Sequence, residues 1–492
     1  MAVNPKKLRP YDQAPRVRAP IIPAAPDNAA TAFLVAGLVW FMLATGIGVL
    51  WVAMRLFPEQ LALNLKMPML NGVITVEFDQ TSVGSGFWNS LLYGWLANAG
   101  LGAIFFITPR LLGRRLVAEP IAMLSAVVWN IGLLAGLTAI YVPQVAASGS
   151  LMEYPLPVDG VLLLALLLAN DSFWRTLLTA RDRSPYVSIW YFGAALAAFT
   201  GLYGLATLAP LFNLSAAGDA LANGFYARAL ETLWVTGLAV GTLYYVIPRA
   251  TGNPLYSSGL AIMAWVLWLG LATLAPLDAL VDTSVPLVIT QIGNVATFLL
   301  VVPAFLVVAN LFQTINGRWT LILSPGTLPF AVVALTFLAA TAMLGAIGSL
   351  GSVQALVRGT DWGVGVRLWV FFGTASLAFL ALADHAFPRL LRRDWGGALL
   401  AEASLWAAFA GTALAGLALI AGGIVHGSLL TQAAAADEIT GTLFWFRLVL
   451  GGGVSLIGLA AIIVTLNVFL MYTSARRADY ALVGEAVPAA GH

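Results

Sequence analysis

The chain has 492 residues, of which 60% are hydrophobic and only 9% are charged, which is too little polar surface to cover a soluble globule of this size. A net charge of +2 gives no reason to expect nucleic acid as a partner. The absence of cysteine excludes disulfides, thiolate metal sites and iron–sulfur clusters. The composition therefore predicts an all-α polytopic membrane protein.

Taken in chain order, residues 1–29 are rich in proline and alanine and contain no short apolar core followed by a cleavage site, so we expect a retained cytoplasmic tail. Residues 30–475 contain twelve apolar runs long enough to cross a bilayer and predict one twelve-helix membrane domain. Short turns separate the runs, no internal repeat of fixed period is evident, and residues 476–492 are expected to form a cytoplasmic C-terminal tail. The runs are centred on Val39, Gly100, Gly132, Ala165, Ala197, Gly237, Leu267, Val301, Leu335, Ala375, Ala413 and Ile457.

The basic residues predict the orientation of the chain in the membrane. Of the 24 Lys and Arg residues, 18 lie before the first run or after an even-numbered run. Because cytoplasmic loops are enriched in Lys and Arg, we expect both termini to be cytoplasmic in a multi-pass protein of the bacterial inner membrane.

Several short motifs occur in order along the later runs. The sixth run ends in Tyr244-Tyr245-Val246-Ile247-Pro248-Arg249 and is followed by Pro254-Leu255-Tyr256-Ser257. Thr360-Asp361-Trp362 precedes the tenth run, and Phe387-Pro388-Arg389-Leu390-Leu391 ends it. With this set of motifs the chain resembles the haem-copper oxidase subunit I superfamily, and in particular the catalytic subunit of cbb3-type cytochrome c oxidases. The resemblance implies a subunit I-like bundle of twelve transmembrane helices.

The resemblance also implies histidine ligands for two haems and a copper ion, and those positions hold other residues here. The family's copper ligands correspond to Arg228, Asp278 and Ala279, and its haem ligands correspond to Phe87, Val366 and Leu368. Phenylalanine, valine and leucine have no lone pair to give iron, and arginine is a permanent cation that cannot bind copper. The chain has three histidines where the family needs six. We therefore expect neither haem nor copper as a cofactor.

The histidines can be interpreted as structural residues as well as functional ones. His385 follows Asp384 near the cytoplasmic end of the tenth run and could be a proton relay or a replacement ligand, but a satisfied interfacial histidine is favoured. His426 is expected at the edge of a loop, and His492 ends the chain.

Charged residues within the runs are the strongest candidates for a site, because a charge inside a bilayer is costly and is usually paired or functional. Arg228 and Glu231 are three residues apart and share a helix face. Asp278 would approach Arg228 if the two former copper positions still face each other, which predicts a buried ion-pair site. A structural role in joining the two helices is favoured over transport or catalysis. The resemblance implies that arginines such as Arg447 pair with haem propionates. Without haem, Arg367 and Arg447 need other anions, such as Asp361, a lipid headgroup or a partner subunit.

The leading functional hypothesis is a non-catalytic scaffold or accessory subunit of a respiratory or electron-transfer complex, with membrane lipids and cytochrome c-bearing subunits as partners. One alternative is a terminal oxidase or NO reductase-type subunit that binds haem through His385 or His426 together with Met or Lys. A second is an ion or small-molecule transporter that uses Arg228, Glu231 and Asp278. A third is a binder of a pigment, quinone or lipid in the space that the cofactors would take.

Overall fold

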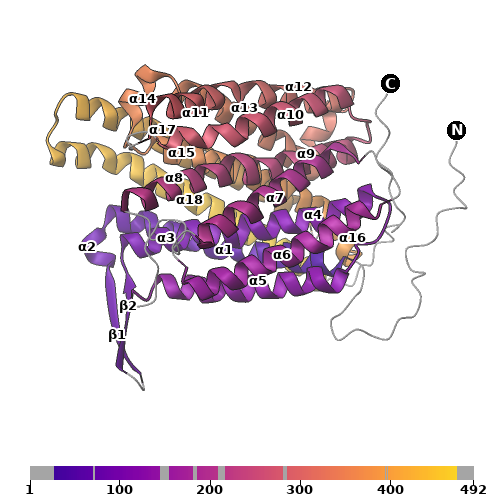
Figure 1. Ribbon diagram of the computed structural model, residues 1–492, viewed down its shortest axis with the longest axis horizontal. Helices are drawn as coiled ribbons and strands as arrows, with labels where there is room; N and C mark the ends of the chain where they lie inside the picture. The colour runs from indigo at the N-terminus through magenta and orange to yellow at the C-terminus, as the bar shows by residue number, and fades with distance from the viewer. Residues whose placement is uncertain are drawn as a thin grey trace, which may run out of the picture.

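The computed structural model describes residues 27–473, except for 70–71, 144–153, 181–184, 209–215, 281–284, 394 and 396. The predicted C-terminal tail, most of the predicted N-terminal tail and His492 lie outside the described residues. Within them, twelve helical spans are long and apolar enough to cross a membrane, and each predicted centre falls inside one of these spans. The predicted all-α, twelve-helix architecture is therefore confirmed (Figure 1).

Several spans consist of more than one helical element. In chain order the elements are α1 (Asn28–Leu56), α2 (Pro58–Leu61), β1 (Leu63–Met69), β2 (Gly72–Phe78), α3 (Gln80–Asn89), η2 (Ser90–Leu96), α4 (Ala97–Leu111), α5 (Glu119–Ile140), α6 (Leu156–Leu178), α7 (Val187–Leu208), α8 (Ala216–Ala229), η4 (Leu230–Val235), α9 (Thr236–Thr251), α10 (Ser258–Leu274), η5 (Ala275–Leu280), α11 (Leu287–Leu299), α12 (Val301–Ile315), η6 (Trp319–Leu323), α13 (Thr327–Gly348), α14 (Gly351–Val357), α15 (Trp362–Leu368), η7 (Trp369–Ser376), α16 (Leu377–Leu391), α17 (Ala398–Thr431) and α18 (Ala436–Thr473).

Three spans form the centre of the bundle. In the second (Gln80–Leu111), sixth (Leu221–Thr251) and tenth (Trp362–Leu391) spans, 100%, 94% and 89% of the most apolar 18-residue stretch is buried within the protein, whereas the share in the other nine spans does not exceed 56%. The outer spans therefore shield the central three and present their remaining apolar side chains to lipid.

The central spans share a pattern that recurs every fourth span. Each contains a π-helical segment, namely η2, η4 or η7, and each has a proline in its last turns followed by arginine. The prolines, Pro109, Pro248 and Pro388, follow one another at intervals of 139 and 140 residues. The expectation that the chain has no internal repeat is therefore corrected. The repeat escapes notice in the sequence because each unit of four spans preserves only a few side chains and a backbone irregularity.

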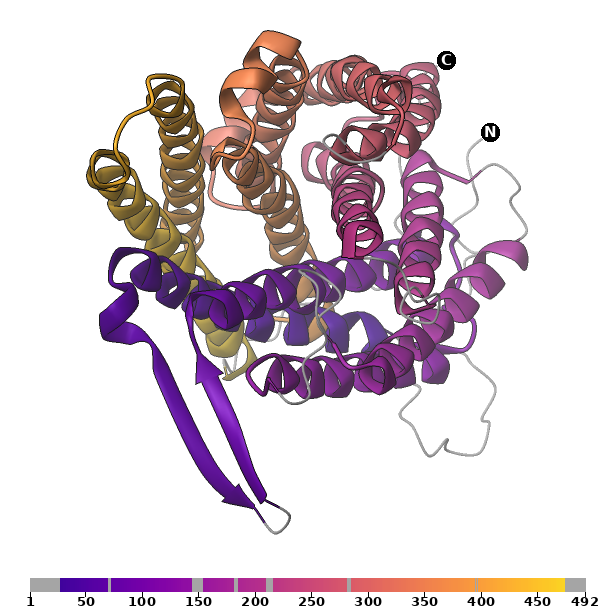
Figure 2. The ribbon, with the colours of Figure 1, turned by 60° about the vertical axis from the view of Figure 1, so that its left-hand side comes forward.

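A long β-hairpin follows α1, where only a short turn was expected. Strands β1 and β2 pair antiparallel, with Leu63 opposite Phe78 and Met69 opposite Gly72. Figures 1 and 2 show the hairpin leaving one end of the bundle and extending outward past the helices. A search for long apolar runs does not detect it, because a half-buried strand alternates apolar and polar residues.

Candidate functional site

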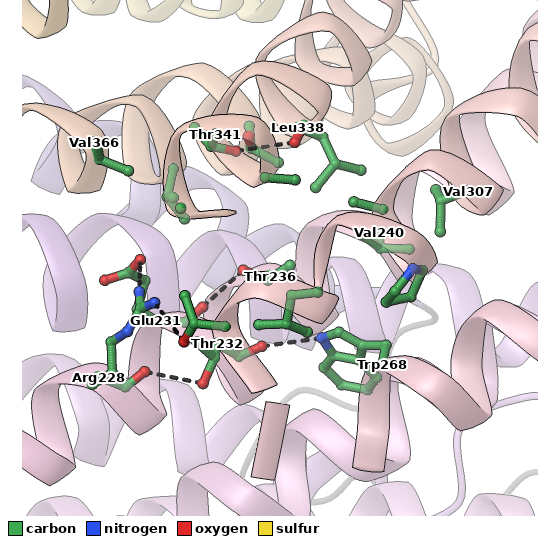
Figure 3. Close-up of a pocket in the computed structure, with 18 of the residues that line it drawn as sticks. Arg228, Glu231, Thr232, Thr236, Val240, Trp268, Val307, Leu338, Thr341 and Val366 are labelled. Carbon is green, nitrogen blue, oxygen red and sulfur yellow. Dashed lines mark hydrogen bonds and ion pairs between the residues drawn. The ribbon is translucent and has the colours of Figure 1, made fainter. Parts of the chain in front are cut away.

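The site is built around Arg228, at the end of α8, immediately before the π-helical segment η4 of the sixth span. Its Nη1 lies 2.6 Å from Oε1 of Glu231, and its Nη2 lies 3.3 Å from Oδ2 of Asp278. A second contact joins Arg228 Nε to Asp278 Oδ1 at 3.4 Å. The structure thus brings together the three residues that the sequence predicted as a buried ion-pair site, and Figure 3 shows Arg228 and Glu231 pointing toward each other.

Asp278 reaches the site because α10 continues as the six-residue 3-10 helix η5. Its Oδ2 accepts a hydrogen bond of 2.6 Å from the Thr297 hydroxyl on α11. Close contact between η5 and α11 requires glycine at position 293, where an added Cβ would lie 2.1 Å from the Asp278 backbone nitrogen. Gly293 therefore sets the distance between the two elements that hold the Asp278 carboxylate.

Side-chain hydrogen bonds connect η4 to the elements around it. Thr236 donates to the Glu231 carbonyl at 2.8 Å, Thr232 donates to the Arg228 carbonyl at 3.0 Å, and the indole of Trp268 donates to the Thr232 carbonyl at 3.1 Å (Figure 3). These three bonds join η4 to α8, α9 and α10 on either side of Glu231.

Arg367, on α15 of the tenth span, adds a second cation to the site. Its Nε lies 3.4 Å from Oε2 of Glu231, so Glu231 binds one arginine through each oxygen. Glu231 is an anion that the sequence did not suggest for Arg367, and the suggested contact of Arg367 with lipid or a partner subunit stays a prediction. Asp361 instead holds Arg55 of α1, with two bonds of 3.0 and 2.8 Å.

The site is therefore a chain of alternating charges: Asp278, Arg228, Glu231 and Arg367. The two cations balance the two anions, and the side chains of Asp278, Arg228 and Glu231 are 15%, 20% and 7% exposed. Removing one member of such a chain leaves an uncompensated charge, which costs far more than an exposed ion pair gains. The sequence missed the link from Glu231 to Arg367, because the two residues lie 136 positions apart and no local spacing connects them.

Two cavities meet at this chain of charges. The larger, of about 690 Å³, is lined by all four charged residues and by polar side chains that include Asn223, Asn294 and Gln354. The smaller, of about 110 Å³, shares Arg228, Glu231, Thr297, Gly345 and Val366 with the first and is otherwise mostly apolar. Figure 3 shows this smaller cavity, with Arg228 and Glu231 at one side and Val240, Val307 and Leu338 at the other.

Two hydroxyl groups that line the smaller cavity are unsatisfied. Tyr191 and Thr374 are almost fully buried, and neither side-chain oxygen has a hydrogen-bond partner among the described residues. Sequence reasoning missed both, since an unsatisfied hydroxyl is visible only once its neighbours are placed.

The positions that the resemblance assigns to haem ligands hold apolar side chains. Phe87, on α3, is fully buried and stacks on Trp51 with 5.3 Å between ring centroids, and Trp88 and Phe372 continue the aromatic cluster. Leu368 is buried at the end of α15, while Val366 lines both cavities. None of the three side chains can donate a lone pair, so this donor set does not fit iron porphyrin bound as the resemblance implies.

The residues at the positions that the resemblance assigns to copper ligands do not fit a copper ion either. Arg228 has no lone pair to donate, the Asp278 carboxylate is engaged by Arg228 and Thr297, and Ala279 has no donor atom. Within the residues that the structure describes, no group of three or more His, Asp or Glu side chains is placed to hold a metal ion.

Two histidines lie among the described residues, and neither stands at one of these positions. His385, in α16, is buried between the rings of Tyr245 and Phe106, and its Nε2 has no hydrogen-bond partner in the described part of the chain. Seventeen residues of one continuous helical span separate it from Leu368, a distance of roughly 25 Å at 1.5 Å per residue. His426 is half-buried near the end of α17. The prediction of a satisfied His385 is therefore wrong with respect to Nε2.

Arg447, the other arginine for which the sequence suggested a lipid or partner contact, lies on α18. Its Nε is buried without an acceptor among the described residues, and Arg55 and Asp361 are close enough to act on its charge. No carboxylate pairs with Arg447 in the described part of the chain, so the suggested lipid or partner contact stays a prediction.

Comparison with known proteins gives a consistent result. Residues 28–455 match the family model described as cytochrome c and quinol oxidase polypeptide I. The cbb3-type cytochrome c oxidase subunit CcoN1 of Stutzerimonas stutzeri is 24% identical over 407 residues, which cover 80% of this chain and 82% of that protein. Cytochrome c oxidase subunit 1 of Rhodobacter capsulatus is also 24% identical, over 65% of this chain and 63% of its own length.

Among solved structures, that of a heme-copper terminal oxidase dimer superposes with a TM-score of 0.76 at 16% sequence identity. The superposition covers 93% of this chain and 87% of the other. At that identity the likeness concerns the fold alone, which is the twelve-helix bundle expected from the sequence.

Proposed function

The chain belongs to the cytochrome c and quinol oxidase polypeptide I family, and from this premise we propose that it is a non-catalytic scaffold or accessory subunit of a respiratory or electron-transfer complex. The main observation behind the proposal is the ion pair between Arg228 and Asp278, which stands at two of the three positions matched to copper ligands. A permanent cation there repels a metal ion, and its carboxylate partner is already engaged.

The aromatic cluster around Phe87 supports the same proposal. A haem ligand must project into an open space beside its helix, whereas Phe87 is fully buried against Trp51. Phe87 therefore stabilises the bundle through its own packing, because buried aromatic rings contribute both apolar area and favourable ring contacts.

The proposed partners rest on the relatives, and the proposed location rests on the distribution of charged residues. The Stutzerimonas stutzeri relative is named as a subunit of a cytochrome c oxidase, and we propose that this chain likewise assembles with membrane subunits, including subunits that carry cytochrome c, and with lipid. The distribution of Lys and Arg supports a bacterial inner-membrane location with both termini cytoplasmic.

The visible absorption spectrum of the purified full-length protein tests the proposal. We expect no Soret band at stoichiometric haem content, and no copper by elemental analysis. A stoichiometric Soret band would overturn the proposal and favour the alternative of an oxidase or NO reductase-type subunit with atypical ligands. If no such band is found, identification of the proteins that co-purify from native membranes would name the partner complex.

One specific observation favours a second candidate function, namely binding or transport of an ion or small molecule. The cavity of about 690 Å³ is lined by Arg228, Glu231, Asp278 and Arg367 and continues into the smaller cavity with its two unsatisfied hydroxyls. Flux into proteoliposomes separates the two candidates: a transporter would lose flux in Asp278→Asn and Glu231→Gln, whereas a scaffold shows none in any variant. Co-purified small molecules would identify a bound pigment, quinone or lipid.

A further inference from the structure

The β-hairpin has one apolar and one polar face. Side chains alternate between the faces of a strand, and directly opposite residues of a pair share a face. The register therefore places Leu63, Leu65, Val76 and Phe78 on one face and Asn64, Lys66, Thr75 and Glu77 on the other. On the apolar face, Leu63 and Leu65 are 51% and 41% exposed. Within the described part of the chain, these two side chains are therefore only partly covered by other residues.

The hairpin begins level with the end of the membrane-spanning helices. It follows α1 and the single turn α2, and Figure 1 shows it running across the direction of the helix axes until it passes beyond α5. Figure 2 shows the same projection from another side. A two-stranded hairpin by itself is marginally stable in water, so one of this length needs a surface against which its apolar face can pack.

The base of the hairpin shows which way the apolar face is turned. The ring of Phe78 lies 4.8 Å from the ring of Tyr141, the residue that directly follows α5. Beside it, the backbone N–H of Glu77 donates to the Tyr141 carbonyl at 2.9 Å. At its base, therefore, the apolar face packs on the end of a membrane-spanning helix. The same face continues outward through Val76 and Leu65 to where none of the described helices lies beneath it.

We propose that the apolar face of this hairpin lies on the lipid bilayer, in the headgroup region at the ends of the spans, with the face of Lys66 and Glu77 turned to water. An apolar surface that starts at the end of α5 and continues level with the ends of the spans meets lipid next. Amphipathic elements bind membranes in this way, with one face a few ångströms below the headgroups. The hairpin thus extends the lipid contact of the bundle sideways, independently of the proposed function.

Spin labels test the contact, because the full-length chain has no native cysteine. Leu65→Cys and Lys66→Cys place a nitroxide on the apolar and polar faces of the same strand, in vesicles of phosphatidylcholine and phosphatidylglycerol. Ile131→Cys, on the lipid-facing side of α5, gives the value for lipid, and Ala435→Cys, in the exposed turn before α18, gives the value for water. The measurement compares collisions with oxygen, which concentrates in lipid, and with a water-soluble nickel complex.

We expect the ratio of oxygen to nickel collisions at Leu65 to approach that at Ile131 and to exceed that at Lys66 by about threefold or more. Equal ratios at Leu65 and Lys66 would overturn the proposal, because the hairpin would then stand in water. Protection of Leu65 from both reagents would also overturn it, because a second protein copy would then cover the face.

Trypsin provides a second measurement that needs no label, since Lys66 is the only basic residue in the hairpin. We expect Leu63→Asp with Leu65→Asp to raise the rate of cleavage after Lys66 in vesicles by about tenfold, as the hairpin detaches and opens. The matched control Asn64→Asp adds a charge on the polar face and should leave the rate unchanged. An equal increase in both variants would contradict the lipid contact.

Discussion

Arg228 and Asp278 lie 50 residues apart in the chain, yet the structure places the Arg228 Nη2 3.3 Å from the Asp278 Oδ2. Their helices are the sixth and seventh spans, so a single ion pair joins a central helix to an outer one. Glu231 and Arg367 extend this contact to the tenth span. The charges therefore connect three spans at the point where the two cavities meet.

The coupling between Arg228 and Asp278 can be measured with a double-mutant cycle. We expect Arg228→Met and Asp278→Leu each to lower the free energy of unfolding, because each leaves the other charge partly buried without its partner. The double variant should recover part of the loss, with a coupling of about 1–3 kcal/mol. Reversible unfolding in mixed micelles gives the values.

The control for this cycle is the ion pair of Arg175 and Asp171, whose side chains are 60% and 32% exposed. We expect a coupling of less than about 1 kcal/mol there, because water screens the charges. Similar couplings at the two pairs would show that the buried pair has no special role in stability.

Gly293→Ala tests whether close packing holds the Asp278 carboxylate in place. The new Cβ would lie 2.1 Å from the backbone nitrogen of Asp278, so α11 must move away from η5. We expect a loss of about 1–3 kcal/mol and a weaker coupling between Arg228 and Asp278. Gly270→Ala on α10 is the matched control, since its Cβ meets no atom within 4 Å. Equal stability of the two variants would refute the close contact.

Phe87→Ala tests the aromatic cluster at the former haem-ligand position. Truncation of this fully buried ring removes its stacking on Trp51, and we expect a loss of about 3–5 kcal/mol. Phe298→Ala, where the ring is 44% exposed on the outside of α11, should cost less than about 1 kcal/mol. If Phe87→Ala cost no more than this control, the cluster would not be a stabilising replacement for a cofactor.

Tyr191→Phe and Thr374→Val test the unsatisfied hydroxyls of the smaller cavity. A buried hydroxyl without a partner contributes no favourable hydrogen bond, so we expect each variant to retain its stability or to gain up to about 1 kcal/mol. A pronounced loss in both variants would mean that the hydroxyls hold a polar ligand. Mass spectrometry of small molecules extracted from the purified protein checks that outcome directly.

Three of the four charged residues of the site could be predicted from the sequence. Arg228 and Glu231 follow from helical spacing, and Asp278 follows from the resemblance, which implied that the two former copper positions face each other. Arg367 was given other partners, because nothing local relates it to Glu231. The cavities, Gly293 and the hydroxyls of Tyr191 and Thr374 carry no signal in a single sequence.

By itself, the sequence determined that twelve helices span the membrane and that the chain contains only three histidines. Both follow from residue type, since hydropathy acts over one span at a time and an absent side chain cannot be restored by folding. Only the tertiary structure decided that Glu231 binds two arginines, that Phe87 fills its site with packed rings, and that a hairpin turns an apolar face outward. The contacts of Glu231 with Arg367 and of Phe87 with Trp51 depend on residues far apart in the chain, which packing alone brings together.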